Sequence, residues 1–420
     1  MNILLLNQYF APDEAATAQM LGDLVESLVV HGMSCQVVAS NRSYSDPARR
    51  YPRRESWRGA RVRRVAVTGF GRRSKVGRLV DYGTFLVGAA LRLVTADRPD
   101  VIIGLSTPPI LGAFAVLAAR LRGCRSVYWA MDVYPDLAFE LGVVSRQSLA
   151  GRVFAAVSRW ALGSADTVVA LGETMAGRLR ALEARNIATI PNWADGEAVR
   201  PMPAEASHYR RERRWTGKFV VLYSGNLGLA HEFESALGAA ERLQKSDGIV
   251  LAFVGVGPRL AGLMSEVRRR GLSNVEFHPP VPREELGDSL AAGDLHLVTL
   301  RPGMPGLLVP SKIYGILAAG RPTLYVGPAE GEVFEIVSRG ACGSQVDNAD
   351  PEELARVILA YREDPDRRAR EGCHARQLFE ARFTRQRSTD AFRGLIKALG
   401  SESDRASGLL PQNDKRGCDA

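Results

Sequence analysis

The sequence predicts an α/β protein whose two doubly wound parallel sheets face each other across a cleft. Short apolar runs alternate with longer helical stretches along most of the 420 residues, an alternation typical of parallel strands joined by helices. The pattern breaks once, at the polar stretch 195–216, and then begins again. Such sheets bind ligands beyond the carboxyl ends of their strands, so we expect the binding site in the cleft between two Rossmann-like domains.

The first domain is expected at residues 1–194. Residues 2–7 form a short apolar run that predicts a buried strand, and Thr17–Val30 has the apolar spacing of a helix. The uncharged run Val101–Ala119 is long enough to suggest a membrane span. Residues 106–109, Ser-Thr-Pro-Pro, interrupt it, which favours a strand, a turn and a helix. Further strands are predicted at 35–40, 101–105, 126–131 and 167–171.

The second domain is expected at residues 217–374. The stretch before it, 195–216, is rich in charge and contains Pro201 and Pro203, so it predicts a linker. The final residues, 399–420, are polar and patternless and predict a disordered tail. Strands are predicted at 219–225, 249–255, 275–279, 294–300 and 323–326.

The composition favours a soluble globular protein with acidic partners. Hydrophobic residues make up 46% of the chain and charged residues 24%, and the net charge is +9, which favours phosphates, nucleic acid or an anionic membrane. The five cysteines form no CxxC pair, which indicates reduced thiols and no structural zinc. No basic region opens the chain, so no signal peptide is expected.

A strongly basic segment suggests a membrane surface. Arg49–Arg78 holds twelve lysines and arginines and the single acid Glu55, and the apolar stretch Leu79–Val94 that follows is too short to span a bilayer. A basic face beside an exposed apolar helix suits anionic lipid. Nucleic acid is a weaker partner, because no nucleic-acid motif occurs. A solvated loop followed by a core helix remains the structural alternative.

Two glycine-rich turns follow predicted strands of the second domain. They are YSGNLG at 223–228, with Gly225, and FVGVGPRL at 253–260, with Gly255. Glycine lets backbone approach a ligand closely, and amides behind such a turn can hold an anion. Neither turn is GxGxxG, so glycines required only by tight turns are an equal interpretation.

The stretch LVPSKIYGILAAGRPTLYVG at 308–327 predicts a loop, a short helix beginning at Ser311-Lys312 and a strand. Ser311 can cap the helix with its hydroxyl. Lys312 opposes the helix dipole, which costs a few tenths of a kcal/mol. An anion such as a diphosphate between helix and ammonium would offset that cost; a solvated surface lysine is the alternative.

Seven motifs in order carry a resemblance to a known family. Together they resemble the retaining glycosyltransferases of family 4, which have the GT-B fold, and most of all the bacterial branch that builds surface polysaccharides and O-antigens. The resemblance runs from about Met1 to Ala398. The motifs are YFAPDEAAT, WAMDVYPD, IPNWAD, YSGNLG, VGVGPRL, VEFHPPVPREEL and VPSKIYGILAAGRP.

The resemblance implies transfer of a sugar, with retention, from a nucleoside-diphosphate sugar, UDP being favoured. The acceptor would be a lipid-diphosphate-linked saccharide, at the cytoplasmic face of the plasma membrane. No metal and no cofactor are expected. The second domain would hold the donor and the first the acceptor, with a helix at 375–398 crossing back to the first domain.

The donor site differs from the usual pattern of that family. Asn226 and His231 stand where many members have an arginine and a lysine, and Leu307 and Gly315 where many have glutamates. Lys312 is then the best-placed cation for the diphosphate, and the ribose would be held by backbone, Glu330 or Glu332. The expected donor-binding residues are Ala16, Thr17, Gly225, Asn226, His231, Gly255, Val281, Arg301, Ser311, Lys312 and Gly315.

Two carboxylates are expected on the acceptor side. Asp132 ends a strand of the first domain, where it could orient the acceptor hydroxyl or accept its proton, or simply cap the turn that follows. Glu140 lies nearby. The resemblance implies no agreed enzymatic nucleophile, so none is named. A sugar-nucleotide 2-epimerase and a non-catalytic membrane-surface scaffold are the alternative functions.

Overall fold

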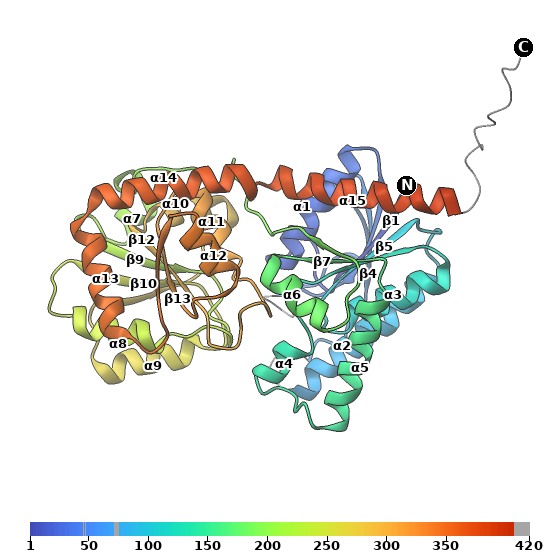
Figure 1. The fold of residues 1–420 in the computed structure, drawn as a ribbon, viewed down its shortest axis with the longest axis horizontal. Coiled ribbons are helices and arrows are strands. Elements are labelled where there is room, and N and C mark those ends of the chain that lie inside the picture. Colours follow the sequence, from blue (N-terminus) through green and yellow to red (C-terminus); the bar gives the residue numbers. More distant parts are fainter. Residues whose placement is uncertain (45, 47, 71–74, 407–420) are drawn as a thin grey trace, which may run out of the picture.

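The computed structural model describes the chain except for residues 45, 47, 71–74 and 407–420. It has two α/β bodies, each built around its own sheet, and two consecutive helices at the end of the chain run along both (Figure 1). None of the helices in the described residues is both long and apolar enough to cross a bilayer.

The first sheet has eight strands in the order β3-β4-β2-β1-β5-β6-β7-β8. All neighbours are parallel except β3 and β4, which form an antiparallel hairpin at the edge. The expected strands are present, and β3, β4 and β8 are additional. The bounds are β1 Asn2–Leu6, β2 Ser34–Ser40, β3 Arg54–Trp57, β4 Ala60–Val65, β5 Val101–Leu105, β6 Arg125–Trp129, β7 Thr167–Ala170 and β8 Ile187–Thr189.

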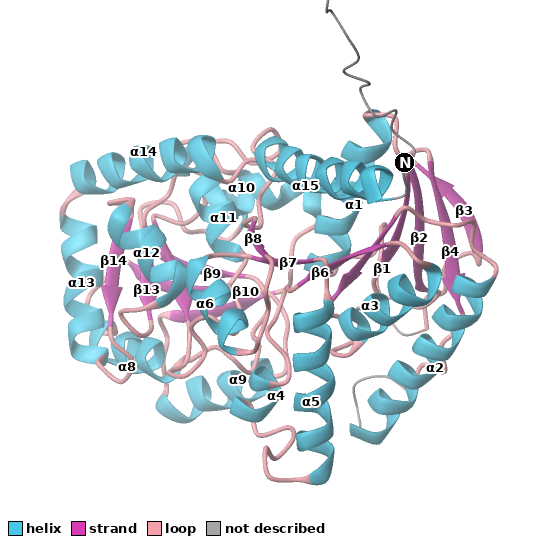
Figure 2. Ribbon diagram, turned by 45° about the vertical axis from the view of Figure 1, so that its right-hand side comes forward, coloured by secondary structure: helices cyan, strands magenta, loops and turns pink. Residues whose placement is uncertain are grey.

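Helices cover both faces of this sheet. Successive residues of β1 point to opposite faces: Ile3 and Leu5 join one apolar core and Leu4 and Leu6 another. The helices α1 and α15 lie over the first face, and α2 and α3 over the second, with α5 beside α3 (Figure 2). The bounds are α1 Ala16–Val30, α2 Lys75–Val94, α3 Leu111–Arg122, α4 Asp136–Glu140, α5 Leu149–Ser164 and α6 Glu173–Ala181.

The second sheet has six strands, all parallel, in the order β11-β10-β9-β12-β13-β14. Only β14 was not expected. The strands are β9 Phe219–Ser224, β10 Ile249–Val254, β11 Val275–His278, β12 Leu295–Thr299, β13 Thr323–Val326 and β14 Gly343–Val346. The helices are α7 His208–Glu212, α8 Glu234–Leu243, α9 Leu260–Arg270, α10 Leu286–Ala291, α11 Lys312–Ala318, α12 Gly331–Arg339, α13 Pro351–Glu363, α14 Pro365–Arg382 and α15 Arg385–Ala406, with short 3₁₀ turns at Ala204–Ala206 and Arg283–Glu285.

Much of the expected linker is packed rather than free. Arg210, on α7, is buried, donates to the Ala292 carbonyl at 2.7 Å and pairs with Asp294 at 3.0 Å. Trp215 is fully buried. Part of the charge that predicts a linker therefore lies in a buried ion pair. At the other end, α15 continues to Ala406, into the region expected to be disordered; residues 407–420 lie outside the described residues.

The end of the chain returns to the first domain. Helix α14 lies on the second domain and α15 on the first, beside α1. Phe392 of α15 packs against Trp129, with ring centroids 4.5 Å apart, and Trp129 stacks on Trp193. One apolar core consequently contains residues from both domains and from this helix.

Candidate active site

The two glycine turns of the second domain pack against each other. Gly225 has φ 137° and Gly255 φ 149°, a region favoured by glycine. A Cβ atom on Gly255 would lie 2.0 Å from the Gly225 carbonyl oxygen. Packing alone therefore requires Gly255. Gly225 lies beside the expected diphosphate residue, since a Cβ there would be 3.2 Å from Cε of Lys312.

Lys312 is a half-buried cation held by an aromatic ring. Its Nζ donates to the Tyr223 hydroxyl at 2.5 Å and lies 3.8 Å from the centre of that ring. The Tyr223 hydroxyl in turn donates to the Asn226 carbonyl at 2.8 Å. Burial lowers the pKa of Lys312 well below its usual range, because an ammonium loses hydration there. Among the described residues, no carboxylate forms a salt bridge with it.

Neither α11 nor α1 begins with a side-chain cap. Ser311 is exposed, has helical backbone angles (φ −61°, ψ −18°) and makes no capping hydrogen bond. A capping side chain needs extended backbone at that position, so the expectation for Ser311 is wrong. In α1 the capping position is Ala15, which places Ala16 and Thr17 inside the helix; Ala16 is exposed and Thr17 half-buried.

His231 does not fit the role of a phosphate ligand. Its side chain is buried, and Nδ1 lies 2.6 Å from the Thr299 carbonyl. A carbonyl accepts, so Nδ1 carries the proton and Nε2 is left as an acceptor. Burial, and then the charge of Lys312, lower the pKa of His231 to about 3. A neutral ring whose free nitrogen accepts suits a hydroxyl or the lysine, and not a phosphate oxygen.

The remaining donor-side residues all belong to the second domain. Asn226 is exposed. Arg301 follows β12 and donates to the Leu229 carbonyl at 3.3 Å. Val281 is half-buried against the second domain's core. A Cβ on Gly315 would lie 3.3 Å from Leu290, so a glutamate at this position would be crowded.

Of the two acids considered for the ribose, Glu332 is already engaged. Its Oε1 accepts from the Met175 backbone amide of α6, in the first domain, at 2.7 Å, and the side chain is buried. Burial raises the pKa of Glu332. Glu330 is exposed. Glu332 thus joins the two domains through one of its carboxylate oxygens.

Asp132 lies just beyond β6 in a protected position. Its backbone amide donates to the Ser106 hydroxyl at 3.1 Å, and residue 132 forms an isolated antiparallel bridge with Leu308 of the second domain. Burial raises the pKa of the Asp132 carboxyl to about 6. The capping residue of α4 is Pro135, so Asp132 does not cap that helix. Glu140 is exposed at the end of α4.

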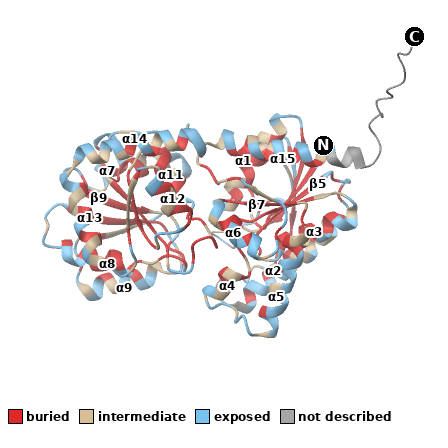
Figure 3. Cartoon of the chain, viewed as in Figure 1, coloured by how far each residue is buried: buried red, intermediate tan, exposed pale blue. Residues whose placement is uncertain are grey.

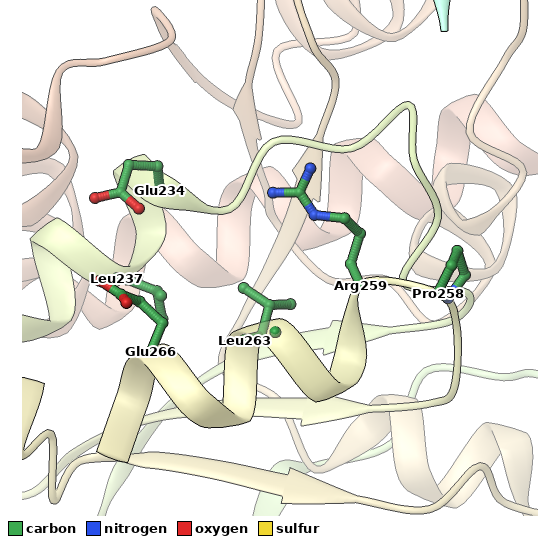
Figure 4. A pocket seen from close by; sticks show the side chains of 7 residues that line it. Glu234, Leu237, Pro258, Arg259, Leu263 and Glu266 are labelled. Carbon is green, nitrogen blue, oxygen red and sulfur yellow. The ribbon is translucent and has the colours of Figure 1, made fainter. Parts of the chain in front are cut away.

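The structure also has features that these expectations do not explain. A shallow pocket of about 310 Å³ lies between α8 and α9 (Figure 4). It contains none of the expected site residues, but reaches the second glycine turn at Pro258. The described residues hold no cluster of three His, Cys, Asp or Glu side chains that could bind a metal.

Comparison with known proteins decides the class. Residues 16–193 match the family described as "Glycosyl transferase 4-like domain", and residues 218–364 match "Glycosyl transferases group 1". The chain is a glycosyltransferase. The resemblance in its sequence to glycosyltransferases is therefore confirmed.

Relatives and solved structures agree with this assignment. The enzyme is 31% identical to WbjE of Pseudomonas aeruginosa, named as a probable glycosyltransferase, over 63% of this chain and 66% of that one. It is 27% identical to WcaI of Escherichia coli K12, named as a putative colanic acid biosynthesis glycosyl transferase, over 80% of this chain and 86% of that one.

The fold is GT-B, as expected. The structure of sucrose-phosphate synthase from Thermosynechococcus elongatus superposes with a TM-score of 0.75 at 17% identity, covering 96% of this chain and all of that one. Anabaena HepE in complex with UDP-glucose gives 0.70 at 17% identity, covering 98% and 100%. The lipopolysaccharide glycosyltransferase WaaG gives 0.70 at 15% identity, covering 93% and 99%.

Sequence reasoning missed two residues of this region. Tyr223 supports Lys312, and Ser106 accepts from the Met131 and Asp132 amides. The sequence could have indicated Tyr223, because it opens the first glycine turn, at the end of a predicted strand. Ser106 was interpreted only as part of an interrupting turn.

Proposed function

We propose that this glycosyltransferase moves a sugar, with retention, from a nucleoside-diphosphate sugar to a saccharide acceptor in bacterial surface-polysaccharide synthesis. The observation that carries the proposal is Lys312, a half-buried ammonium beside a glycine turn with no carboxylate partner among the described residues. The name of WcaI supports the polysaccharide, and the complex of HepE with UDP-glucose supports a UDP-sugar donor.

The diphosphate would bind against Lys312. Tyr223 holds the ammonium from one side, and the backbone of Gly225 lies close to its stem. A bound diphosphate favours the charged amine and returns its pKa toward the usual range. Asn226, which is exposed, and Arg301, which donates to the Leu229 carbonyl, would supply further hydrogen bonds to the donor.

Asp132 would face the acceptor. At neutral pH a carboxyl with a pKa near 6 is mostly ionised, so it can accept a hydrogen bond from the acceptor hydroxyl and orient it. The acceptor oxygen then bonds to the anomeric carbon as the bond to the diphosphate oxygen breaks. The hydroxyl proton passes to the leaving phosphate on the same face, which keeps the configuration without an enzymatic nucleophile.

We further propose that the first domain rests on the cytoplasmic face of an anionic membrane, where a lipid-diphosphate-linked acceptor would be found. Helices α2, α3 and α5 lie next to one another and expose apolar side chains, including Leu79 at 68%, Leu121 at 78% and Leu149 at 77% (Figure 3). Lipid is a suitable cover for such a face.

The three helices contribute exposed charge of one sign to this face. Asp81 is the single acid in the three helices, and it is buried, accepting from the Gly69 and Phe70 amides. The exposed cations of the helices are Arg78, Arg120, Arg152 and Arg159. The face therefore extends beyond the basic segment expected from the sequence. Part of that segment is instead used in β3 and β4, where Arg64 is buried against Glu55.

The reaction is tested by mixing the enzyme with UDP-, GDP- and dTDP-sugars and a lipid-linked saccharide. Transfer with an unchanged anomeric configuration, followed by NMR, is the expected result. An isomerised donor would instead indicate an epimerase. No reaction with any combination of donor and acceptor would indicate a scaffold. Because a ligand of the folded state raises the melting temperature, the nucleotide that raises it most identifies the base.

The membrane proposal is tested by sedimentation with vesicles of phosphatidylglycerol or phosphatidylcholine at low salt. The enzyme should bind the anionic vesicles, and Leu149→Glu with Val153→Glu should weaken binding about tenfold or more. Met264→Glu, on exposed α9 of the second domain, is the control and should bind normally. Wild-type protein that ignores anionic vesicles would refute the proposal.

A further inference from the structure

A loop of the second domain is bonded to the acceptor side of the first. The loop Arg301–Pro310 connects β12 to α11, and so ends directly before Ser311 and Lys312. Near its end the Leu307 carbonyl accepts from the Val133 amide at 2.8 Å, and Leu308 forms an antiparallel bridge with Asp132. The two domains therefore meet through backbone contacts at two consecutive residues of each segment.

Glycines let the backbone of this loop touch the first domain. Gly306 has φ 75°, and a Cβ there would lie 2.8 Å from Cγ of Arg178 and 3.1 Å from the Thr174 carbonyl oxygen. Gly303 has φ 81°, and a Cβ there would lie 3.1 Å from the Glu140 carboxylate. The loop is therefore pressed against both α6 and α4.

Apolar packing and contact with α12 hold the loop in place. Met304 and Leu307 are buried in the core that both domains share. A Cβ on Gly331 would lie 3.0 Å from Pro305, and Gly331 begins the helix from which Glu332 accepts the Met175 amide. The loop is thus held by the first domain on one side and by α12 on the other.

We infer that the loop Arg301–Pro310 is a positioning element. When the two domains close, its backbone contacts with the turn at Asp132 bring the Asp132 carboxylate, on the acceptor side, and Lys312, on the donor side, into a fixed relative position. The inference rests on the proposed function for the roles of those two residues. Lys312 follows Leu308 by four residues, so the Cα atoms of Asp132 and Lys312 can be no more than about 20 Å apart while the bridge is formed.

Two consequences distinguish positioning from simple packing. Nucleotide bound at Lys312 should protect the Val133 amide from hydrogen exchange, although that amide belongs to the other domain. The reason is that the loop bonded to Val133 ends directly before Lys312. A loop that is undocked should break this link. Nucleotide affinity should then fall by the same factor by which nucleotide protects the Val133 amide in the wild type, because the coupling between the two is reciprocal.

The variant Gly306→Ala tests the link, with Gly217→Ala as its control. Both glycines have φ 75°, but a Cβ on Gly217 meets no atom within 4 Å. The two substitutions therefore impose the same backbone strain, and only one disturbs the interface. Hydrogen exchange of the peptide around Val133 is measured with and without UDP, GDP or dTDP, and nucleotide affinity by calorimetry.

We expect the Val133 region to exchange about tenfold faster or more in Gly306→Ala, and to gain no protection from nucleotide. Wild type and Gly217→Ala should gain it and should bind nucleotide equally, whereas Gly306→Ala should bind more weakly by about the factor of protection that the wild type gains. Normal protection in Gly306→Ala, or its loss in Gly217→Ala as well, would overturn the inference.

Two further arms keep the test decisive. If Gly306→Ala does not fold, Gly303→Ala strains the same loop through its positive φ of 81°, and the same outcomes apply. Failure of the wild-type enzyme to bind any of the three nucleotides would count against the proposed donor site, whereas the exchange rates without nucleotide would still support or overturn the bridge.

Discussion

Replacing Lys312 with methionine should weaken nucleotide binding and stabilise the fold at the same time. Methionine keeps an unbranched side chain and removes the ammonium that lies over the Tyr223 ring. A hydrogen bond to a charged group contributes about 1.5–3 kcal/mol, so UDP affinity should fall about tenfold to a hundredfold.

Stability should change in the opposite direction. The pKa of Lys312 is lower in the folded protein than in the unfolded chain, so near neutral pH the unfolded chain holds this proton more readily. This difference lowers the free energy of unfolding most at pH values below the folded pKa, and the effect disappears as pH rises toward the unfolded pKa. Removing the amine removes this destabilisation, so the melting temperature without ligand should rise.

Calorimetry with UDP and thermal unfolding, both at pH 7, measure the two effects. Lys245→Met, at an exposed lysine beyond the end of α8, is the matched control and should alter neither. If UDP binds Lys312→Met as tightly as it binds the wild type, the lysine is not in the donor site and the proposed geometry is wrong.

Two other substitutions give separate tests. Asp132→Asn should reduce kcat about a hundredfold, and wild-type kcat/KM should decline as the pH falls through about 6, because protonation removes the carboxylate that accepts a hydrogen bond from the acceptor hydroxyl and orients it; a flat pH–rate profile between 5 and 7 would contradict the assignment. Glu332→Ala leaves the buried Met175 amide unpaired and should cost about 1–3 kcal/mol in urea denaturation, whereas Glu332→Gln keeps an acceptor and should cost clearly less; equal losses would show that the hydrogen bond contributes little.

The apolar runs alone predict the strands of both sheet centres, because strands covered on both faces must be apolar throughout. They cannot predict β3 and β4, because RESW in β3 and ARVRRV in β4 contain no continuous apolar run. In β4 the signal is alternation, with Ala60 and Val62 buried and Arg61 exposed, which a search for continuous runs overlooks. Arg64 breaks even that alternation, because its charge is paired inside the protein.

The site could be predicted only in part. Lys312 is recognisable from its place at the start of a short apolar helix. The residue that holds it, Tyr223, is far away in sequence and meets it only through the order of strands in the second sheet. Glu332 was a reasonable ribose ligand from its position, but its partner is a backbone amide of the other domain, and no local pattern reveals such a contact.

The return of α15 to the first domain also bears on how the protein is made. Synthesis proceeds from the N-terminus, yet Phe392, which covers Trp129, is made only after the whole second domain. Until α15 has been synthesised, the first domain therefore has this aromatic surface uncovered. A chain truncated before residue 385 would carry its defect in the domain made first, where a chaperone or protease can recognise it.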